Sequence, residues 1–358
     1  MSRRGLTFAV AAALIAVLAV LATVLPVPYV ILVPGPVTDT LGDVPTASGG
    51  TRPVVAVSGA QSYPPSGHLY LTTVGVVPGS CDRHPTLLQA LRSWFNDTQA
   101  VEPQQVICPP GESSTAVQHQ NEQDMSQSQV DAITAALLHL GYKPLTERVV
   151  VAEILDPKSP AASVLQQADV ILAVDGHAIS TADELRTQVG AHPIGTALRL
   201  TIERGGKKQD VVVKTIDSGD GSHRAVIGIK PDLHATFKNV KVTIGIDPAQ
   251  VGGPSAGLAF TLGIIDKLTP GDLTGGRTVA ATGTIDAFGT VGPIGGIQQK
   301  IAGALRAHAT AFLVPTGDCA DAKKVAPSSL VLVKVDTLDT ALAALGRLAT
   351  GSGTFPRC

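Results

Sequence analysis

The sequence predicts an α+β fold in which two folded units, the second rich in strands with two helices, follow one transmembrane helix. Three observations predict this. The length of 358 residues allows about two domains of roughly 100 to 200 residues each. Residues 6–25 form an uncharged apolar run. The rest of the chain alternates between apolar residues at every second position and apolar residues at helical spacing, the patterns of strands and helices.

The composition argues against several classes of function. The 27 Lys and Arg residues are balanced by 29 Asp and Glu residues, so the chain has no basic field for nucleic acid. It contains no G-x-x-x-x-G-K-[ST] loop, the pattern that binds nucleotide phosphates. Its nine histidines form no H-E-x-x-H motif or paired zinc cluster. We therefore expect no nucleic acid, no ATP, no metal and no other cofactor.

Residues 1–33 are expected to form a transmembrane signal anchor with its flanks. At about 1.5 Å per residue the apolar run reaches about 30 Å, the thickness of a hydrocarbon core. Arg3 and Arg4 precede the run, and the next charged residue is Asp39, so the positive-inside rule predicts a cytoplasmic N-terminus and an outside location for the rest. The alternative is a signal peptide cleaved near Val20-Leu21-Ala22, although the run is longer than is usual for one.

Residues 34–53 are dense in Pro, Gly and Thr and are expected to form a linker. The segment 54–142 begins with strands predicted at 54–57 and 69–74. It ends with a helix predicted at 124–140, because apolar residues recur there at helical spacing before a glycine. Between them, residues 81–121 are polar and irregular, with one short helix expected at 86–94.

Residues 148–216 predict a separate unit. The order is a strand at 149–155, a Ser-Pro-Ala-Ala turn, a strand at 169–174, an Asp-Gly turn, a helix at 181–189, and strands at 197–203 and 210–215. This order resembles a bacterial PDZ domain. The resemblance implies capture of an extended peptide as an added strand. Ala168 stands where the family usually has glycine, and no Gly-rich carboxylate-binding loop precedes Val149.

The segment 222–348 carries the candidate chemistry. Alternating apolar residues from 240 to 246 predict a half-buried strand. Gly252-Gly253-Pro254-Ser255-Ala256-Gly257 follows, before an apolar helix at 258–268. Ser255 therefore stands near a helix N-terminus, whose unpaired N–H groups suit an oxyanion. We expect backbone donors around Gly253 and Ser255 to hold that oxyanion, and the glycines would let a substrate carbonyl approach the backbone closely. The alternative is a serine that only caps the helix.

A second motif begins at Gly295-Gly296 and predicts a helix with an apolar stripe. Lys300 falls three residues after Ile297 and four before Ala304, so its side chain points with the stripe. Burial lowers the pKa of a lysine, and the neutral amine can take a proton from a serine hydroxyl. The alternative is a lysine whose charged end reaches solvent past the edge of the stripe.

Together the two motifs resemble the proteolytic domain of Lon proteases. The matching patterns are G-P-S-A-G around Ser255, T-G-T-I from Thr282, and G-x-V-x-P-I-G-G-I-x-x-K-I-x-x-A around Lys300. The resemblance implies a Ser-Lys dyad in which Ser255 is the nucleophile, Lys300 is the general base and Thr282 orients the lysine. Gly252 and Thr284 replace acidic residues that are usual in the family.

The layout as a whole resembles membrane-anchored PDZ/Lon-like peptidases that lack an ATPase. This resemblance implies an ATP-independent serine endopeptidase of the cell membrane, with its catalytic domain outside the cytoplasm. Its substrates would be extended or misfolded polypeptides, and its PDZ domain would bind substrate or partner peptides. Homo-oligomers, including rings, are the assembly expected from the family. The alternative is a non-catalytic, membrane-tethered PDZ scaffold. Residues 349–358 are expected to form a C-terminal tail.

All four cysteines follow the apolar run, and an even number in an oxidising compartment predicts disulfides. Proximity in sequence favours Cys81 with Cys108 and Cys319 with Cys358. The alternative is free, buried thiols.

The order of the elements also predicts that the PDZ unit is inserted within the Lon-like domain. Without earlier elements, the strand from Val240 would have nothing to pack against, and the apolar face of the helix at 124–140 would be exposed. We therefore expect that helix to contact the helix after Ser255, with the inserted unit leaving near Tyr142 and returning near Gly221. In the alternative, residues 54–140 form a separate body.

Overall fold

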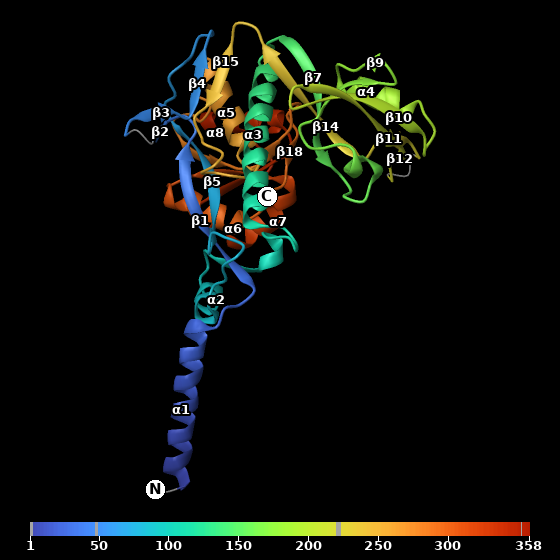
Figure 1. Cartoon of the computed structure of the whole chain (residues 1–358). Coiled ribbons are helices and arrows are strands. Elements are labelled where there is room, and N and C mark those ends of the chain that lie inside the picture. Colours follow the sequence, from blue (N-terminus) through green and yellow to red (C-terminus); the bar gives the residue numbers. More distant parts are fainter. Residues whose placement is uncertain (1–2, 47–48, 220–222, 352) are drawn as a thin grey trace.

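The computed structural model describes residues 3–46, 49–219, 223–351 and 353–358. One long helix, α1 (Arg3–Val24), projects from a main body, and a second sheet unit protrudes from the side of that body at the end away from α1 (Figure 1). We call residues 144–237 the second unit, and the rest of the chain after α1 the main body.

Helix α1 is long and apolar enough to cross a membrane over Thr7–Val24, and none of that segment is buried. A helix that is apolar on all sides and unburied is typical of a membrane span. A signal sequence near the N-terminus has the same properties.

The main body is built on a six-stranded sheet in the order β20-β19-β16-β5-β1-β6. Strands β5, β16, β19 and β20 run parallel, and β1 pairs antiparallel with β5 and β6. The strands are β1 (Tyr29–Asp39), β5 (His68–Val77), β6 (Ala100–Pro103), β16 (Thr278–Ala281), β19 (Ala311–Pro315) and β20 (Val331–Val335).

Strand β1 corrects two predicted boundaries. The prediction of a linker over 34–53 is wrong for residues up to Asp39, and the flank of the anchor after residue 28 is also part of β1. Val30 and Ile31 are buried, and the pairing with β5 shifts register between Pro34 and Val37. A bulge tolerates the prolines that made this segment resemble a linker. Further on, β2 (Asp43–Pro45) and β3 (Thr51–Pro53) pair with each other.

Helices cover both faces of the sheet. On one face, Val279, Ala281 and Leu313 share a core with α3 (Ser114–His139), α5 (Gly257–Leu268) and α8 (Leu338–Thr350). On the other face, Ala280 and Phe312 pack with α6 (Ile297–Arg306) and α7 (Cys319–Val325). This division follows the alternation of side chains along each strand.

The other elements of the main body are short. They are α2 (Leu87–Trp94), the pair β4 (Val55–Ser58) and β15 (Lys241–Ile244), the hairpin β17 (Thr284–Ile285) and β18 (Val291–Gly292), and short 3-10 turns at Gln104–Val106 and Thr316–Asp318.

Helix α3 is longer than the sequence pattern predicts. It begins at Ser114, with Ser113 as its N-cap, and so occupies part of the stretch that was expected to be irregular. Its first turns are mostly polar and exposed, and therefore carry no apolar periodicity from which a helix can be predicted.

The second unit has its own sheet, in the order β11-β10-β8-β7-β14, and its own apolar core. The sheet of this unit extends beyond the predicted end at 216, because β14 pairs along β7 from Ile229 to Phe237. The unit comprises β7 (Pro144–Ile154), β8 (Val170–Val174), β9 (His177–Ala178), α4 (Ala182–Gly190), β10 (Ala197–Arg204), β11 (Lys207–Lys214), β12 (Ile216–Asp217), β13 (Ala225–Val226), β14 (Ile229–Phe237) and a 3-10 turn at Pro160–Ser163.

The main body is assembled from chain on both sides of the second unit. Strand β4 pairs with β15, and Thr261 Oγ1 on α5 donates to the carbonyl oxygen of Ala132 on α3 at 3.4 Å. The predicted contact between the two helices is therefore present, and the unit is an insertion. It leaves after α3 and returns through β14; the crossing predicted near Gly221 and the boundary at 222 lie outside the described residues.

Both predicted disulfides are present. Cys81 is bonded to Cys108 and Cys319 to Cys358, with Cα atoms 5.7 and 5.0 Å apart. The second bond ties the C-terminal segment to α7, and Lys334 N–H donates to the carbonyl of Pro356 at 3.0 Å. The predicted tail is thus held against the edge strand β20.

Candidate active site

Ser255 stands in the turn that leads into α5, and it is half-buried. The residue that caps α5 is Ala256, and no side chain accepts a cap hydrogen bond there. The interpretation of Ser255 as an ordinary helix cap is therefore wrong. Its hydroxyl instead faces a lysine from a helix on the other face of the sheet.

Lys300 is the partner of that hydroxyl. Its Nζ lies 2.6 Å from Ser255 Oγ and donates to Thr282 Oγ1 at 3.1 Å. The lysine is only 2% exposed, so the alternative of a charge that reaches solvent is wrong. Burial lowers the pKa of Lys300 to about 7, and the negative charge of Asp318 opposes part of that shift. An appreciable neutral fraction therefore exists near neutral pH.

Thr282, fully buried at the end of β16, connects the two residues. Its hydroxyl accepts from Lys300 and donates to the carbonyl oxygen of Ser255 at 3.1 Å, and Gly283 N–H donates to the same oxygen at 3.0 Å. Gly283 has φ +153°, and a Cβ there would lie 2.8 Å from Val291 Cγ1. The site requires glycine at 283 for this close packing.

Gly253 does not have the role expected of it. Its N–H donates to the carbonyl oxygen of Asn121 on α3 at 2.9 Å and is not free for an oxyanion. For the N–H of Ser255, by contrast, there is no acceptor among the described residues. Ser128 on α3 donates its hydroxyl to the carbonyl of Pro254 at 2.9 Å. Asn121 and Ser128 were not predicted from the sequence, although a serine on the buried face of α3 was a signal that could have been used.

A cleft of about 620 Å³ opens beside Ser255 and Lys300. Residues 72–76 of β5 line it. Strand β16 pairs only with His68 to Leu71 of β5, so beyond Leu71 the ladder of β5 continues only on the β1 side. Val106 and Ile107, within the loop closed by the Cys81–Cys108 bond, also line this cleft and an adjoining groove of about 630 Å³. The two hollows share a wall.

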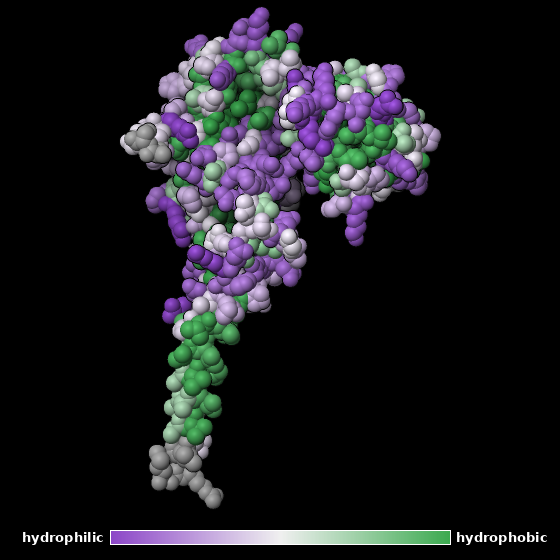
Figure 2. Space-filling model, in the orientation of Figure 1, coloured by the Kyte–Doolittle hydropathy of each residue, from purple (hydrophilic) through white to green (hydrophobic). Residues whose placement is uncertain are grey.

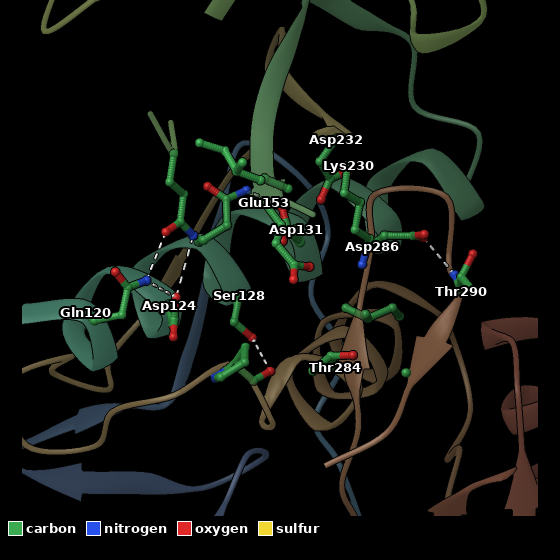
Figure 3. A pocket seen from close by; sticks show the side chains of 17 residues that line it. Gln120, Asp124, Ser128, Asp131, Glu153, Lys230, Asp232, Thr284, Asp286 and Thr290 are labelled. Carbon is green, nitrogen blue, oxygen red and sulfur yellow. Dashed lines mark hydrogen bonds between the residues drawn. The ribbon is translucent and has the colours of Figure 1, made fainter. Parts of the chain in front are cut away.

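A second cleft of about 670 Å³ lies where α3, the second unit and the β17–β18 hairpin meet (Figure 3). Asp131 of α3 and Asp232 of β14 are buried there and hydrogen-bonded to each other. Asp232 Oδ1 accepts from Leu233 N–H at 2.7 Å and Ala287 N–H at 3.1 Å. Burial and the charge of Asp232 raise the pKa of Asp131 to about 9, so Asp131 holds the proton. Across the described residues, no group of three or more His, Cys, Asp or Glu side chains is arranged to hold a metal ion.

Residues 123–215 match the family model of the PDZ domain. The chain contains a PDZ domain. The match includes the end of α3 as well as the strands of the second unit up to β11. Two solved structures resemble this part of the chain. One is the PDZ domain of an SdrC-like protein from Listeria monocytogenes (25% identity, TM-score 0.22, covering 23% of this chain and 85% of that one). The other is the second domain of a Listeria protein in solution (23% identity, TM-score 0.22, covering 24% and 82%).

A groove of about 430 Å³ runs between α4 of the PDZ domain and the main body. It is lined by Arg186 of α4, Leu233 of β14, Leu138 of α3 and Phe288 in the turn of the β17–β18 hairpin. The PDZ domain and the main body therefore contribute to one groove.

The chain is also similar to curated Lon proteases. It is 36% identical over 131 residues to Lon protease 1 of Sorangium cellulosum, 31% over 183 residues to Lon protease 1 of Bacillus subtilis, and 29% over 230 residues to a Lon protease of Chloroflexus aggregans. These matches cover 36%, 49% and 62% of this chain but only 16%, 23% and 27% of the relatives. The chain spans less than a third of the length of each.

Proposed function

We propose that this protein is an ATP-independent serine endopeptidase that acts through a Ser255–Lys300 dyad. The observation that carries the proposal is the 2.6 Å contact between Lys300 Nζ and Ser255 Oγ in a buried setting that lowers the pKa of Lys300 to about 7. A nucleophile and a base within hydrogen-bond distance, with a third group orienting the base, are the requirements of nucleophilic catalysis. The similarity to Lon proteases supports the same reaction.

In the proposed reaction, neutral Lys300 takes the proton of the Ser255 hydroxyl as Oγ bonds to the carbonyl carbon of the scissile peptide. The carbonyl oxygen becomes an oxyanion, for which the N–H of Ser255 at the start of α5 is the candidate donor. When the intermediate collapses, the C–N bond breaks and the Lys300 ammonium gives its proton to the leaving amine. Water then attacks the acyl carbon while Lys300 takes a proton from it. The ester bond to Ser255 Oγ breaks, and the Lys300 ammonium returns the proton to Oγ as the carboxylate product leaves.

The cleft beside the dyad suits an extended polypeptide. Residues 72–76 of β5 line it, and a substrate strand can add to a sheet edge through main-chain hydrogen bonds. The hydroxyl of Thr72 is buried there without a partner in the described part of the chain. We therefore assign loosely folded or extended polypeptides as the substrate class.

The proposed location is the outer side of the cell membrane, with α1 as the anchor. The apolar segment Thr7–Val24 supports anchoring, and the two disulfides support an oxidising compartment. The PDZ domain would bind substrate or partner peptides in the groove between α4 and Phe288. A homo-oligomer, ring-shaped as in Lon-type proteases, is part of the proposal.

The test is cleavage of an unfolded protein and of fluorogenic peptides by the full chain in detergent without ATP. The wild type should cleave both, whereas Ser255→Ala and Lys300→Met should lose at least about 10²-fold in rate, the lower end of what a positioned general base contributes. Val212→Ser, at an exposed position on β11 that lines none of the clefts described above, is the control. A Lys300→Met variant as active as the wild type would refute the dyad. A wild-type protein that binds peptides but never cleaves them would favour the scaffold alternative.

A further inference from the structure

Helix α2 buries small side chains and exposes large apolar ones, which is the reverse of an ordinary surface helix. Its small residues Ala90 and Ser93 are buried, whereas Leu91, Trp94 and the C-cap Phe95 are 45%, 70% and 84% exposed. A surface helix of a soluble body normally turns its large apolar side chains inward and its polar ones outward. Leu91 is three residues before Trp94 and four before Phe95, so the three side chains share one side of the helix. They form an exposed apolar face.

Helix α2 starts next to the end of α1. Leu87 N–H at the start of α2 donates to the carbonyl of Leu25 at 2.9 Å, and Val27 N–H donates to Pro85 at 3.0 Å. In Figure 1, α2 stands directly between α1 and the sheet, and in Figure 2 the apolar surface of α1 ends at the same tip of the body. An eight-residue helix is only about 12 Å long, and a headgroup layer is about 5 to 7 Å thick. A helix that lies in the plane of the surface places its whole apolar face in that layer, whereas one that stands along the membrane normal would reach beyond it.

The residue types fit an interface between lipid and water. Tryptophan and other amphipathic aromatic residues gather at the headgroup level. A short helix with an apolar face and a cationic or polar opposite side lies in the plane of the interface. On α2, Gln89 and Arg92 are exposed beside the apolar face. A protein partner would also bury these side chains, but the backbone hydrogen bonds that join the start of α2 to the end of α1 favour lipid.

We propose that α2 and Phe95 rest in the headgroup region of the outer leaflet of the membrane that α1 spans. This inference rests on the proposed anchoring of the chain by α1. The loop closed by the Cys81–Cys108 bond contains α2 as well as Val106 and Ile107 of the cleft wall. Seating α2 in the membrane therefore holds the cleft close to the bilayer surface. The substrates that this geometry favours are polypeptide segments near the membrane.

Trp94 is the only tryptophan of the chain, so the tryptophan fluorescence of the protein reports the environment of α2. The full chain is reconstituted into vesicles of phosphatidylcholine and phosphatidylglycerol whose acyl chains carry bromine at a shallow or a deep carbon. We expect Trp94 emission to shift to shorter wavelength and to be quenched more by shallow than by deep bromine. A double variant with Leu91→Glu and Phe95→Glu, which retains Trp94, should lose the quenching. Leu145→Glu, equally exposed on β7 of the PDZ domain, should retain it.

The other outcomes distinguish a failure of the α2 contact from a failure of the α1 anchor and from a contact between copies of the chain. Flotation with the vesicles without any quenching by brominated lipid would refute the α2 contact and leave the anchor intact. Protection of Trp94 from aqueous acrylamide that rises with protein concentration, with no lipid quenching, would identify α2 as a contact between copies and also refute the proposal. Failure to float after alkaline washing would refute the anchor and this inference together. Peptide cleavage, measured on the same samples, reports the dyad separately.

Discussion

The Nζ atom of Lys300 and the Oγ1 atom of Thr282 are 3.1 Å apart, and the same hydroxyl donates to the carbonyl of Ser255. Thr282 thereby fixes the amine and the backbone of the serine with a single oxygen. The lysine belongs to α6 on one face of the sheet and the serine to α5 on the other, so a residue at the end of β16 between them is the natural bridge.

Replacing Thr282 by Val should therefore weaken the proposed reaction without removing its chemistry. Loss of a buried partner costs about 1 to 3 kcal/mol, or roughly 5- to 150-fold in kcat/KM. Because the hydroxyl accepts a hydrogen bond from the ammonium form, its loss should also move the rising limb of the pH profile to lower pH. Thr282→Ser should restore both properties. An unchanged pH profile in Thr282→Val would mean that Thr282 only supports the local structure.

The pH dependence of cleavage follows from Lys300. The pKa of Lys300 is lowered to about 7 by burial, and the reaction requires the neutral amine, so kcat/KM should rise with pH through about 7 and then level off. Cleavage that instead falls across this range would exclude Lys300 as the base.

The burial of Lys300 also predicts how the stability of the protein depends on pH. A lysine is normally protonated up to pH 10.5, but the folded protein keeps Lys300 neutral above about 7. The free energy of unfolding therefore increases as the pH rises from about 7 to 10.5. Below about pH 7, burial of the charged amine lowers the free energy of unfolding by its full amount. Lys300→Met should remove the cost and unfold at a higher temperature than the wild type near pH 7, while being inactive. Thermal unfolding followed by circular dichroism would test this, and a lower melting temperature would contradict it.

The two disulfides should have different effects when removed. The Cys319–Cys358 bond closes a loop with a sequence separation of 39 and ties the chain end to α7, so the double Ser variant should lose about 2 to 4 kcal/mol of stability. The Cys81–Cys108 bond encloses part of the cleft wall, so its removal should raise KM for extended peptides more than it lowers kcat. Denaturant unfolding and steady-state kinetics on both variants separate the two effects. An equal rise in KM for both would contradict the assignment of the cleft wall.

The burial of Lys300 was predictable because its place in an apolar stripe is a local property of α6. The contact with Ser255 could be inferred only through family resemblance, because 45 residues separate the pair and no local pattern relates them. Strand β1 was missed because its prolines resemble those of a linker, whereas its burial depends on partners in β5 and β6. The bonds from Asn121 and Ser128 of α3 to the loop before Ser255 were missed because they depend on the packing of α3 against that loop.

The last prediction concerns Asp131 and Asp232, which hold the second unit (residues 144–237) against α3 and the β17–β18 hairpin (Figure 3). The nearby charged and titratable groups are Asp286 of the hairpin, Glu153 and Lys230 of the PDZ sheet, Asp124 of α3, and His234. Burial lowers the pKa of His234 to about 4, so it is neutral above that pH.

The unfolded carboxyl of Asp131 ionises near its ordinary value of 3.8, whereas burial and the charge of Asp232 keep the folded one protonated up to about pH 9. The contribution of Asp131 to stability is therefore full at low pH and is lost as the pH rises through this window. Asn at position 131 mimics the protonated acid and can still donate to Asp232, so Asp131→Asn should melt at a higher temperature than the wild type at neutral pH, with a flatter dependence on pH.

Asp232→Ala provides the contrast. It leaves the N–H groups of Leu233 and Ala287 without their acceptor and should cost about 1 to 3 kcal/mol. Melting curves of the wild type, Asp131→Asn, Asp232→Ala and Asp232→Asn across the pH range show which of the two carboxyls holds the proton. If Asp131→Asn were destabilising at every pH while Asp232→Asn left the melting temperature unchanged, the proton would belong to Asp232. Asp232, and not Asp131, would then donate the hydrogen bond between them.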